Sequence, residues 1–357
     1  DANLMPLGGI VNHILALLKR CKTVLQCHQV HAAIIRKGLE QDRFLISHLL
    51  SLSAPSLPYS LFIFHRLNEP STVFYNVLFK AFSMAGNHLC DAVSLFVRMK
   101  CSSNAAPDSY TFPSMIKTCS TSKKIGESMH ASVIRCGFSN DVYCGSSLVD
   151  FYGKLMDVAS ARKVFDELSE KNVVTWTAMV VGYVHVGDIH NAVKLFKQMP
   201  VSNLLTWNTI ISGLVQTGQL SYAKKLFEEM PDKDCVSFTV MIKGFIMIGD
   251  MPSARAMFEQ AKEKDIVMLT TLVNGYVQNG QPEEAIEIYR EMDSTGIEPD
   301  SHLISCLISA CSKAGNIEMC EWMESYLTRS SCDMNQPYVM SALIDMNAKC
   351  GNMERAK

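Results

Sequence analysis

The chain has 357 residues, of which 48% are hydrophobic and only 19% are charged, and its formal net charge at pH 7 is -2. This composition excludes a disordered or collagen-like protein, and no apolar run reaches the roughly eighteen residues that a membrane-spanning helix needs. The near-neutral charge argues weakly against a non-specific nucleic-acid binder, which is usually basic. The charge is uneven, however, because residues 1–141 hold 14 Lys+Arg and 8 Asp+Glu, whereas the remainder holds 19 and 27.

The cysteine pattern and the first residue of the chain bear on the cellular compartment. The 13 cysteines are scattered without a Cys-x-x-Cys pair, so we interpret them as buried thiols in a reducing compartment. The chain begins at Asp1 rather than at a methionine. We therefore expect that a targeting segment is missing or has been removed.

A repeat of 31 residues organises much of the chain. The glycines at 187, 218, 249 and 280 are 31 residues apart, and the same step separates alanines at 161, 192, 223, 254 and 285. Aromatic residues keep this register as well, at 165, 196, 227, 258 and 289. Landmarks of three kinds in one register identify a repeat protein.

Each repeat is predicted to be a helical hairpin. In residues 204–234, apolar residues from Trp207 to Val215 recur at three- and four-residue spacing, as one helix face requires. Gly218 can adopt the left-handed conformation that ends a helix, and Pro231 stops a second amphipathic run. One hairpin cannot bury both apolar faces, so the fold class is all-α, a right-handed α-solenoid of stacked helix-turn-helix repeats with a concave surface.

The repeats resemble pentatricopeptide repeats. Residues 173–200 (VVTWTAMVVGYVHVGDIHNAVKLFKQMP) and 204–231 (LLTWNTIISGLVQTGQLSYAKKLFEEMP) carry the signature. The mixture of lengths resembles the plant organellar PLS subclass, which alternates standard, long and short repeats. SYTFPSMIKTCS is typical of a long repeat and VMSALIDMNAKCG of a short one. The tetratricopeptide family is the nearest competitor, but its steady period of about 34 residues does not match.

The resemblance divides the chain as follows. A divergent long-type repeat occupies 1–42, and a short repeat at 43–71, a standard one at 72–108 and a long one at 109–141 follow. Four short repeats come next, at 142–172, 173–203, 204–234 and 235–265. A standard repeat at 266–300, a long one at 301–336 and a truncated short one at 337–357 complete the array. Because the terminal NMERAK aligns with DVASARKVF in a second helix, we expect the natural sequence to continue beyond it.

The resemblance also implies which residues face RNA. In this family the first helices line the groove, and the fifth and last residues of a repeat read one base. The implied pairs are Asn76 with Asp108, Ser146 with Asn172, Thr177 with Asn203, Asn208 with Asp234, Thr239 with Asp265, and Thr270 with Asp300. Aspartate only accepts hydrogen bonds and so suits the ring N–H of guanine or uracil, whereas asparagine can donate to adenine or cytosine. A short Thr or Ser leaves room for a purine. The predicted site is 5′-UNAAUGGN-3′, in which Pro113 of the long repeat reads no base.

Two further sets of residues complete the predicted groove. By the same resemblance, the second residue of each repeat should contact base faces: Val73, Val174, Leu205, Val236 and Val267, with Tyr110, Tyr143 and His302 as departures. The alternative for this set is a place in the core at the helix start. Lys154, Lys313 and Lys349 lie late in first helices and could reach phosphates, although a solvated charge explains each almost as well.

Catalytic motifs are weak. The chain has no glycine-rich phosphate loop and no zinc-deaminase signature, so we predict no catalytic site, no metal site and no cofactor. His28 and His31 beside Cys27 are interpreted as core or surface residues rather than metal ligands. The chain itself is therefore not expected to be an enzyme.

The functional hypothesis follows from the resemblance. It implies sequence-specific binding of single-stranded organellar RNA, as the site-recognition factor for C-to-U editing in a mitochondrion or chloroplast. Deaminase chemistry would lie in a C-terminal domain or in a partner recruited in trans, with editing-factor proteins as further partners and neither a membrane nor a small-molecule substrate involved. The alternatives are a factor for organellar RNA splicing or stabilisation, and a protein-interaction scaffold of the tetratricopeptide type.

Overall fold

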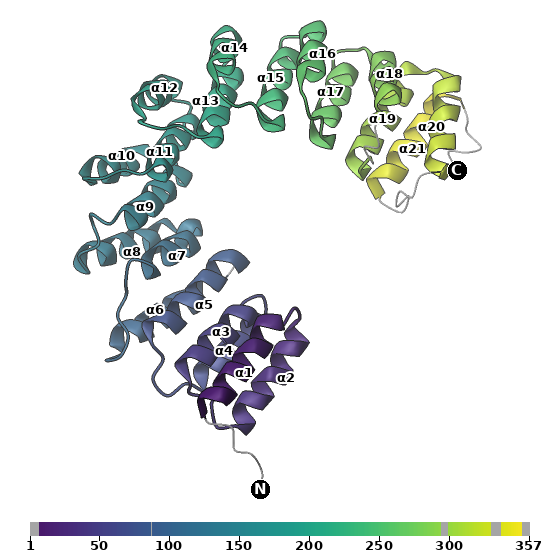
Figure 1. The fold of residues 1–357 in the computed structure, drawn as a ribbon. Helices are drawn as coiled ribbons and strands as arrows, with labels where there is room; N and C mark the ends of the chain where they lie inside the picture. Colours follow the sequence, from purple (N-terminus) through teal and green to yellow (C-terminus); the bar gives the residue numbers. More distant parts are fainter. Residues whose placement is uncertain (1–6, 87, 294–298, 330–336, 352–357) are drawn as a thin grey trace. The chain divides into compact units, whose positions relative to one another are not determined.

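The computed structural model describes residues 7–86, 88–293, 299–329 and 337–351, and all regular structure within these ranges is helical (Figure 1). The chain divides into two compact parts, an N-terminal part at Asp1–Val186 and a C-terminal part at Gly187–Lys357. The predicted all-α class is thus confirmed. Within the described residues, every helix is too short or too polar to cross a membrane.

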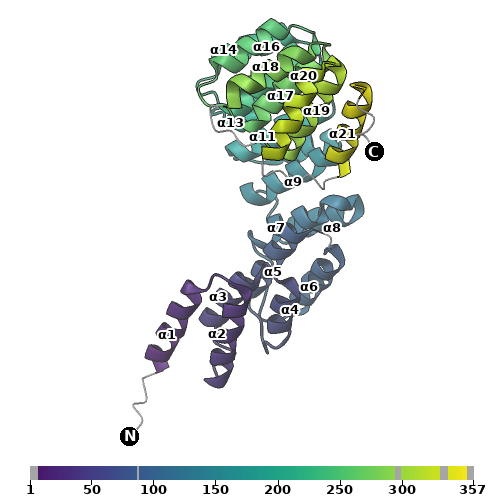
Figure 2. The same cartoon turned by 90° about the vertical axis from the view of Figure 1, so that its right-hand side faces the viewer.

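The N-terminal part consists of helical hairpins in chain order. Its helices are α1 (Leu7–Arg20), α2 (Val24–Arg36), α3 (Arg43–Ser53), α4 (Leu57–His65), α5 (Thr72–Ala85), α6 (Leu89–Cys101), α7 (Thr111–Thr118), the 3-10 helix η1 (Cys119–Thr121), α8 (Lys123–Arg135), α9 (Val142–Lys154), α10 (Val158–Glu167) and α11 (Val173–His185). The first helices of successive hairpins, which are α1, α3, α5, α7, α9 and α11, pack side by side (Figures 1 and 2). This row of first helices is the feature that the predicted groove requires.

The C-terminal part repeats the arrangement. Its helices are α12 (Ile189–Gln198), α13 (Leu204–Gln216), α14 (Leu220–Glu229), α15 (Cys235–Met247), α16 (Met251–Gln260), α17 (Ile266–Gln278), α18 (Pro282–Asp293), α19 (Ser301–Ala314), α20 (Ile317–Arg329) and α21 (Pro337–Lys349). Here the first helices α13, α15, α17, α19 and α21 pack in sequence. The stacking that defines a repeat solenoid is therefore present in each part.

Helix starts follow the predicted repeats closely. Nine first helices begin at the first residue of their repeats: α3, α5, α9, α11, α13, α15, α17, α19 and α21. Helix α7 begins at Thr111, two residues after the first residue of its repeat. Gly218 has a φ of 75°, which is the left-handed turn predicted between α13 and α14. The assignment of short, standard and long types stays a prediction, and residues 352–357 (NMERAK) lie outside the described residues.

Alanine and aromatic residues join the hairpins. The alanines at 161, 192, 223, 254 and 285 are fully buried, as close helix approach requires. Aromatic residues of the second helices contact aromatic residues at the next first helix: Phe165 lies 5.0 Å from Trp176, Phe196 4.7 Å from Trp207 and Phe227 5.2 Å from Phe238, between ring centroids. These edge-to-face pairs stabilise the stacking of one hairpin on the next.

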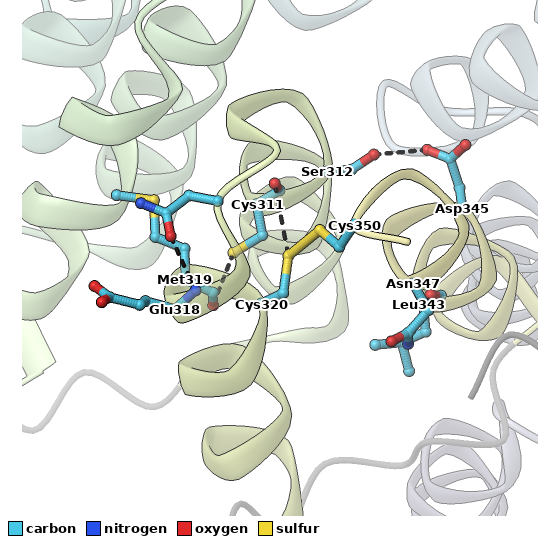
Figure 3. The surroundings of a disulfide bond; sticks show 10 residues. Cys311, Ser312, Glu318, Met319, Cys320, Leu343, Asp345, Asn347 and Cys350 are labelled. Atoms are coloured by element: carbon cyan, nitrogen blue, oxygen red, sulfur yellow. Dashed lines mark hydrogen bonds between the residues drawn. A yellow bond between two sulfur atoms is a disulfide. The ribbon is translucent and has the colours of Figure 1, made fainter. Parts of the chain in front are cut away.

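The cysteines depart from the prediction of buried thiols. Cys320 of α20 and Cys350, which follows α21, form a disulfide between adjacent hairpins, as Figure 3 shows. The cysteines at 90, 101 and 136 are exposed. The interpretation as buried thiols is therefore wrong for these five residues, because a cysteine count shows neither which side of a helix each cysteine lies on nor how the hairpins stack.

Glycine at position 126 permits close packing of α8 against α9, which gives a stability test. A Cβ atom at Gly126 would lie 1.9 Å from Cζ of Phe151, a side chain that is only 1% exposed and so has little room to move. We expect Gly126→Ala to destabilise the fold by about 1–3 kcal/mol, the usual cost of overpacking. Urea denaturation followed by circular dichroism measures the change. Ser128→Ala, at an exposed site on α8, is the matched control and should change stability by less than about 0.5 kcal/mol.

Candidate nucleic-acid interface

The last residue of most repeats caps the first helix of the next, whereas Ser71 before α5 makes no side-chain cap. In the five repeats of residues 142–300 the Oδ1 atom accepts a hydrogen bond from the backbone N–H three residues later: Asn172 from Thr175 at 2.9 Å, Asn203 from Thr206 at 2.9 Å, Asp234 from Ser237 at 2.9 Å, Asp265 from Met268 at 2.8 Å, and Asp300 from Leu303 at 2.8 Å. Asp42, Asp108 and Asp141 make the same bond, each at 2.9 Å. Such a side chain satisfies an N–H that the helix leaves unpaired. The cap fixes the rotamer of the predicted reading residue.

Asn76 and Asp108 form a closed hydrogen-bonding group. The Asn76 amide donates to both carboxylate oxygens of Asp108, at 3.0 and 3.2 Å. The Thr111 hydroxyl lies 2.7 Å from Oδ1 of Asn76 and 2.9 Å from Oδ1 of Asp108. Because the Asp108 carboxylate only accepts hydrogen bonds, the end of the Asn76 side chain that faces it must be the NH2 group. The structure thus brings the first predicted pair together and adds Thr111 to it.

Asn208 and Asp234 form a second direct pair. The Asn208 amide donates to Oδ1 of Asp234 at 3.2 Å, while its own Oδ1 is buried without a hydrogen-bond partner among the described residues. Burial alone would raise the pKa of Asp234, but hydrogen bonds from the Ser237 backbone, the Asn208 amide and the Ser237 hydroxyl outweigh it and hold the pKa below its ordinary value. A buried oxygen that accepts no hydrogen bond, such as Oδ1 of Asn208, costs free energy, and a hydrogen-bond donor on a ligand would remove this cost.

In the pairs that contain Ser or Thr, the hydroxyl hydrogen-bonds mainly within its own helix. Each hydroxyl donates to a backbone carbonyl four residues earlier in its helix: Ser146 to Val142 at 2.6 Å, Thr177 to Val173 at 2.7 Å, Thr239 to Cys235 at 2.7 Å, and Thr270 to Ile266 at 2.7 Å. The Ser146 hydroxyl also lies 3.4 Å from Oδ1 of Asn172 and 2.6 Å from the Thr175 hydroxyl. Thr177 lies in the N-terminal part and Asn203 in the C-terminal part, so their pairing stays a prediction.

All seven predicted base-contacting residues are exposed. Tyr110 and Tyr143 are 77% and 69% exposed, and Val73, Val174, Leu205, Val236 and Val267 are between 54% and 62% exposed. The alternative that they belong to the core is therefore wrong. His302 is exposed as well. Phe44, which is the second residue of repeat 43–71, is 56% exposed and was missed, although its position in the repeat could have revealed it.

The three predicted phosphate contacts are already engaged within the chain. The Lys154 ammonium lies 2.6 Å from Asp150 and that of Lys349 lies 2.7 Å from Asp345, while Lys313 donates to the carbonyl of Val277 at 3.2 Å. The exposed lysines at the ninth position of their repeats, 80, 117 and 243, were missed. Lys80 and Lys117 line a hollow of about 600 Å³ in the N-terminal part.

The histidines near the start have a structural place. His31 Nδ1 lies 2.7 Å from the Tyr59 hydroxyl, and the His28 ring lies 4.1 Å from the Tyr59 ring. Burial, followed by the nearby charges of Arg66 and His28, lowers the pKa of His31. Within the described residues, no group of three or more His, Cys, Asp or Glu side chains could hold a metal ion.

Comparison with known proteins identifies the family. A PPR repeat family model matches residues 202–245 and 264–313, and a PPR repeat model matches residues 146–173, 174–204, 236–266 and 304–331, so that together they cover just over half of the chain. The chain belongs to the pentatricopeptide repeat family. Membership of the PLS subclass stays a prediction.

Relatives agree with this family, and one solved structure agrees with the fold. A putative pentatricopeptide repeat-containing protein of Arabidopsis thaliana is 57% identical over 345 residues, which are 95% of this chain and 62% of the relative. Another from that plant, named as chloroplastic, is 36% identical over 172 residues, which are 47% of this chain and 37% of the relative. The crystal structure of the pentatricopeptide repeat protein PPR10 from maize has a TM-score of 0.57 at 17% identity and covers 97% of this chain and 60% of that one. This chain thus spans less than two thirds of the relatives it matches.

Substitutions at Asp234 separate its capping role from its charge. Asparagine caps α11 and α13 with the same Oδ1 geometry, so we expect Asp234→Asn to change the free energy of unfolding by less than about 0.5 kcal/mol at pH 7. Asp234→Ala removes the cap and should cost about 1 kcal/mol. Urea denaturation of both variants measures these changes. Equal losses in the two variants would contradict the cap as the structural role of Asp234.

The lowered pKa of Asp234 predicts a dependence on pH. An aspartate in an unfolded chain has a pKa of about 3.9, so the stabilisation from ionised Asp234 is fully present above about pH 4 and is lost as the pH falls through the lower folded pKa. We expect the stability difference between the natural chain and Asp234→Asn to be constant from about pH 7 to 5 and to shift in favour of the variant below about pH 4. Urea midpoints across this range measure it, and an unchanged difference at low pH would contradict the prediction.

Proposed function

We propose that this chain binds single-stranded RNA in a sequence-specific manner, one base per repeat, at the site 5′-UNAAUGGN-3′. One observation carries the proposal: the second residue of each repeat from 72–108 to 266–300 is an exposed apolar or aromatic side chain, and in two of these repeats the small polar fifth residue donates a hydrogen bond to the last residue, as Asn76 does to Asp108 and Asn208 to Asp234. Side chains of this kind supply a surface for base faces, and the polar pairs supply donors and acceptors for base edges.

The six polar pairs fall into three chemical types, and each type supports a different base. In Asn76 with Asp108 and Asn208 with Asp234, the carboxylate accepts the ring N–H of uracil, and the longer asparagine reaches the smaller pyrimidine. In Thr239 with Asp265 and Thr270 with Asp300, the short threonine leaves room for guanine. Asparagine at the last position, in Ser146 with Asn172 and Thr177 with Asn203, can donate to the ring acceptor of adenine.

The net charge supports specificity rather than general affinity. A formal charge of -2 gives little attraction to phosphates in general, so the free energy of binding must come from bases. Each mismatched base would then cost about 1–3 kcal/mol, by analogy with DNA-reading proteins.

For the cellular role, we propose recognition of a C-to-U editing site in a mitochondrion or chloroplast. The resemblance to the PLS subclass supports this role, and the name of the 36% identical relative places that protein in the chloroplast. The deaminase would be a C-terminal domain or a protein recruited in trans. Loss of editing at one UNAAUGGN-containing transcript in a plant that lacks the protein, with transcript level and splicing unchanged, is the expected result, whereas loss of the transcript itself would favour a stabilising role.

Exchange of the two predicted guanine readers tests the code. We expect Asp265→Asn with Asp300→Asn to shift the preference of the chain from UNAAUGGN to UNAAUAAN, because asparagine can donate to the ring acceptor of adenine. Each matched base should change the affinity by about 5- to 150-fold, which corresponds to about 1–3 kcal/mol. Fluorescence anisotropy with both labelled RNAs measures the change.

A matched control uses the same chemistry away from the predicted groove. Asp188 and Asp250 cap the second helices α12 and α16 in the same way that Asp265 caps α17. Asp188→Asn with Asp250→Asn should leave base preference unchanged. Preference for guanine in both double variants would overturn the assigned register, and no base preference in the natural chain would favour a peptide-binding scaffold.

A further inference from the structure

A buried hydroxyl follows four of the six polar pairs. It belongs to the third residue of the next repeat, which is Thr111, Thr175, Thr206 or Ser237. The side chains of all four residues are 0% exposed, so none of them can contact a base directly. Any effect of these third-position hydroxyls on base selection must therefore act through the polar pair of the preceding repeat.

The three threonines direct this hydroxyl at the side chain of the last residue of the pair. The distances from Oγ1 to Oδ1 of that residue are 2.9 Å from Thr111 to Asp108, 2.9 Å from Thr175 to Asn172 and 2.7 Å from Thr206 to Asn203. Threonine is branched at Cβ, which restricts its χ1 angle. The same hydroxyl direction therefore recurs wherever the third residue is threonine.

Ser237 directs its hydroxyl at the backbone instead. The hydroxyl donates to the carbonyl oxygen of Asp234 at 2.7 Å and accepts from the Asp234 N–H at 2.8 Å. Serine lacks the methyl group that restricts threonine, so its hydroxyl can take this direction. Asn208 therefore receives no hydrogen bond from Ser237, and its buried Oδ1 has no partner among the described residues.

The two asparagine–aspartate pairs consequently hold their amide groups differently. The amide of Asn76 makes three contacts, because its NH2 group donates to both oxygens of Asp108 and its Oδ1 accepts from the Thr111 hydroxyl at 2.7 Å. In the part of the chain that the structure describes, the amide of Asn208 is held by one hydrogen bond, of 3.2 Å, to Asp234. Turning the amide of Asn76 would break three contacts. Turning that of Asn208 would break one and would bring its unpartnered oxygen out of the protein.

Uracil and cytosine differ in what they offer to such an amide. The ring nitrogen N3 donates a hydrogen bond in uracil and accepts one in cytosine. A carboxylate accepts the N–H of uracil and repels the ring acceptor of cytosine, because it has no hydrogen to give. An amide that can turn presents its NH2 group to cytosine instead. A firmly held amide therefore excludes cytosine, whereas a loosely held one admits both pyrimidines.

We propose that the third-position hydroxyl is a positioning residue for the reading amide of the preceding repeat, so that Thr111 makes repeat 72–108 strict for uracil whereas Ser237 leaves repeat 204–234 tolerant of cytosine. The inference rests on the proposed function and deepens it, because it concerns the two repeats that would read uracil. The site is then UNAAYGGN, in which Y is uracil or cytosine. Two repeats with the same reading pair thus differ in selectivity because of a residue that touches no base.

The first experiment changes the RNA. Fluorescence anisotropy measures binding of the natural chain to UNAAUGGN and to versions in which the first or the second U is replaced by C. Each hydrogen bond that must break lowers the affinity by about two- to tenfold. Turning the amide of Asn76 breaks two contacts more than turning that of Asn208. We therefore expect the preference for uracil over cytosine to be at least about fivefold larger at the first U than at the second, and equal preferences would overturn the inference.

The second experiment adds one methyl group. Ser237→Thr installs the residue that the two preceding repeats carry at the same fully buried position, Thr175 and Thr206. The new side chain should turn its hydroxyl toward Asp234 and Asn208, as Thr111 does toward Asp108 and Asn76. We expect the preference for uracil at the second U to rise about fivefold and the preference at the first U to stay unchanged. A folded variant with the preference of the natural chain at both positions would overturn the positioning role.

The third experiment is the reverse exchange. Thr111→Ser keeps a hydroxyl for the Asp108 N–H, which now lies 3.1 Å from Thr111 Oγ1, and removes only the methyl group. We expect the preference for uracil at the first U to fall about fivefold, with the second U unaffected. Thr118→Ser is the matched control on the same helix, because the Thr118 hydroxyl donates to the Ser114 carbonyl at 2.9 Å and contacts no polar pair. Equal preferences in Thr111→Ser and Thr118→Ser would overturn the role of Thr111.

The outcomes separate this inference from the proposed function. A merely structural role of the third-position hydroxyl would change the affinity for all RNAs by the same factor and leave the ratio of uracil to cytosine binding unchanged, which would overturn the inference while the RNA-binding function stands. Absence of RNA binding by the natural chain would overturn both. Urea midpoints of Ser237→Thr and Thr111→Ser show whether each variant is folded, and if one is not, the other and the comparison of the two U positions in the natural chain still decide.

Discussion

The side-chain cap at the start of the first helices, present in every repeat from 142–172 to 301–336, is the interaction on which the candidate interface depends. The residue that caps one helix, such as Asp234, belongs to the previous repeat and pairs there with the fifth residue, Asn208. One hydrogen bond thus fixes where the next helix begins, and it holds the side chain that would read a base in one rotamer. The spacing of the polar pairs is therefore the spacing of the repeats, which explains physically why one repeat would correspond to one base.

Much of the fold could be predicted because its requirements are local and periodic. A left-handed turn favours glycine, as at Gly218, and a close helix crossing favours alanine, as at Ala223, so both recur at a step of 31 residues, although Met156 takes the glycine position of repeat 142–172 with a φ of 58°. The reading residues are harder to identify from sequence. Asp and Asn are favoured at an N-cap whether or not they also read a base. Asp42 caps α3 and Asp141 caps α9 in the same geometry without belonging to a predicted pair. What distinguishes Asn208 is its contact with Asp234, which only the fold can supply.

The remaining features depend on side-chain rotamers and on the stacking of hairpins, which the sequence alone does not fix. Whether Lys154 is available to a phosphate is decided by the rotamer that brings it to Asp150, and the disulfide of Cys320 with Cys350 depends on how two hairpins stack. Exposure of the second-position side chains was also open from sequence, because a valine at a helix start suits a core as well as a groove. The structure decides this point at Val73 and Val174, which are 55% and 62% exposed.

Affinity and specificity are expected to come from different repeats. Residues 1–141 carry 14 basic and 8 acidic residues and include the cationic hollow, whereas the rest of the chain carries 19 and 27. A surplus of acidic residues repels phosphates, so repeats 142–300 can retain an RNA only through correct base contacts. A contact to a phosphate adds the same free energy to right and wrong sequences and leaves their ratio unchanged. Because phosphate contacts add little in repeats 142–300, a mismatched base there would remove a larger share of the free energy of binding than it would in a strongly basic protein.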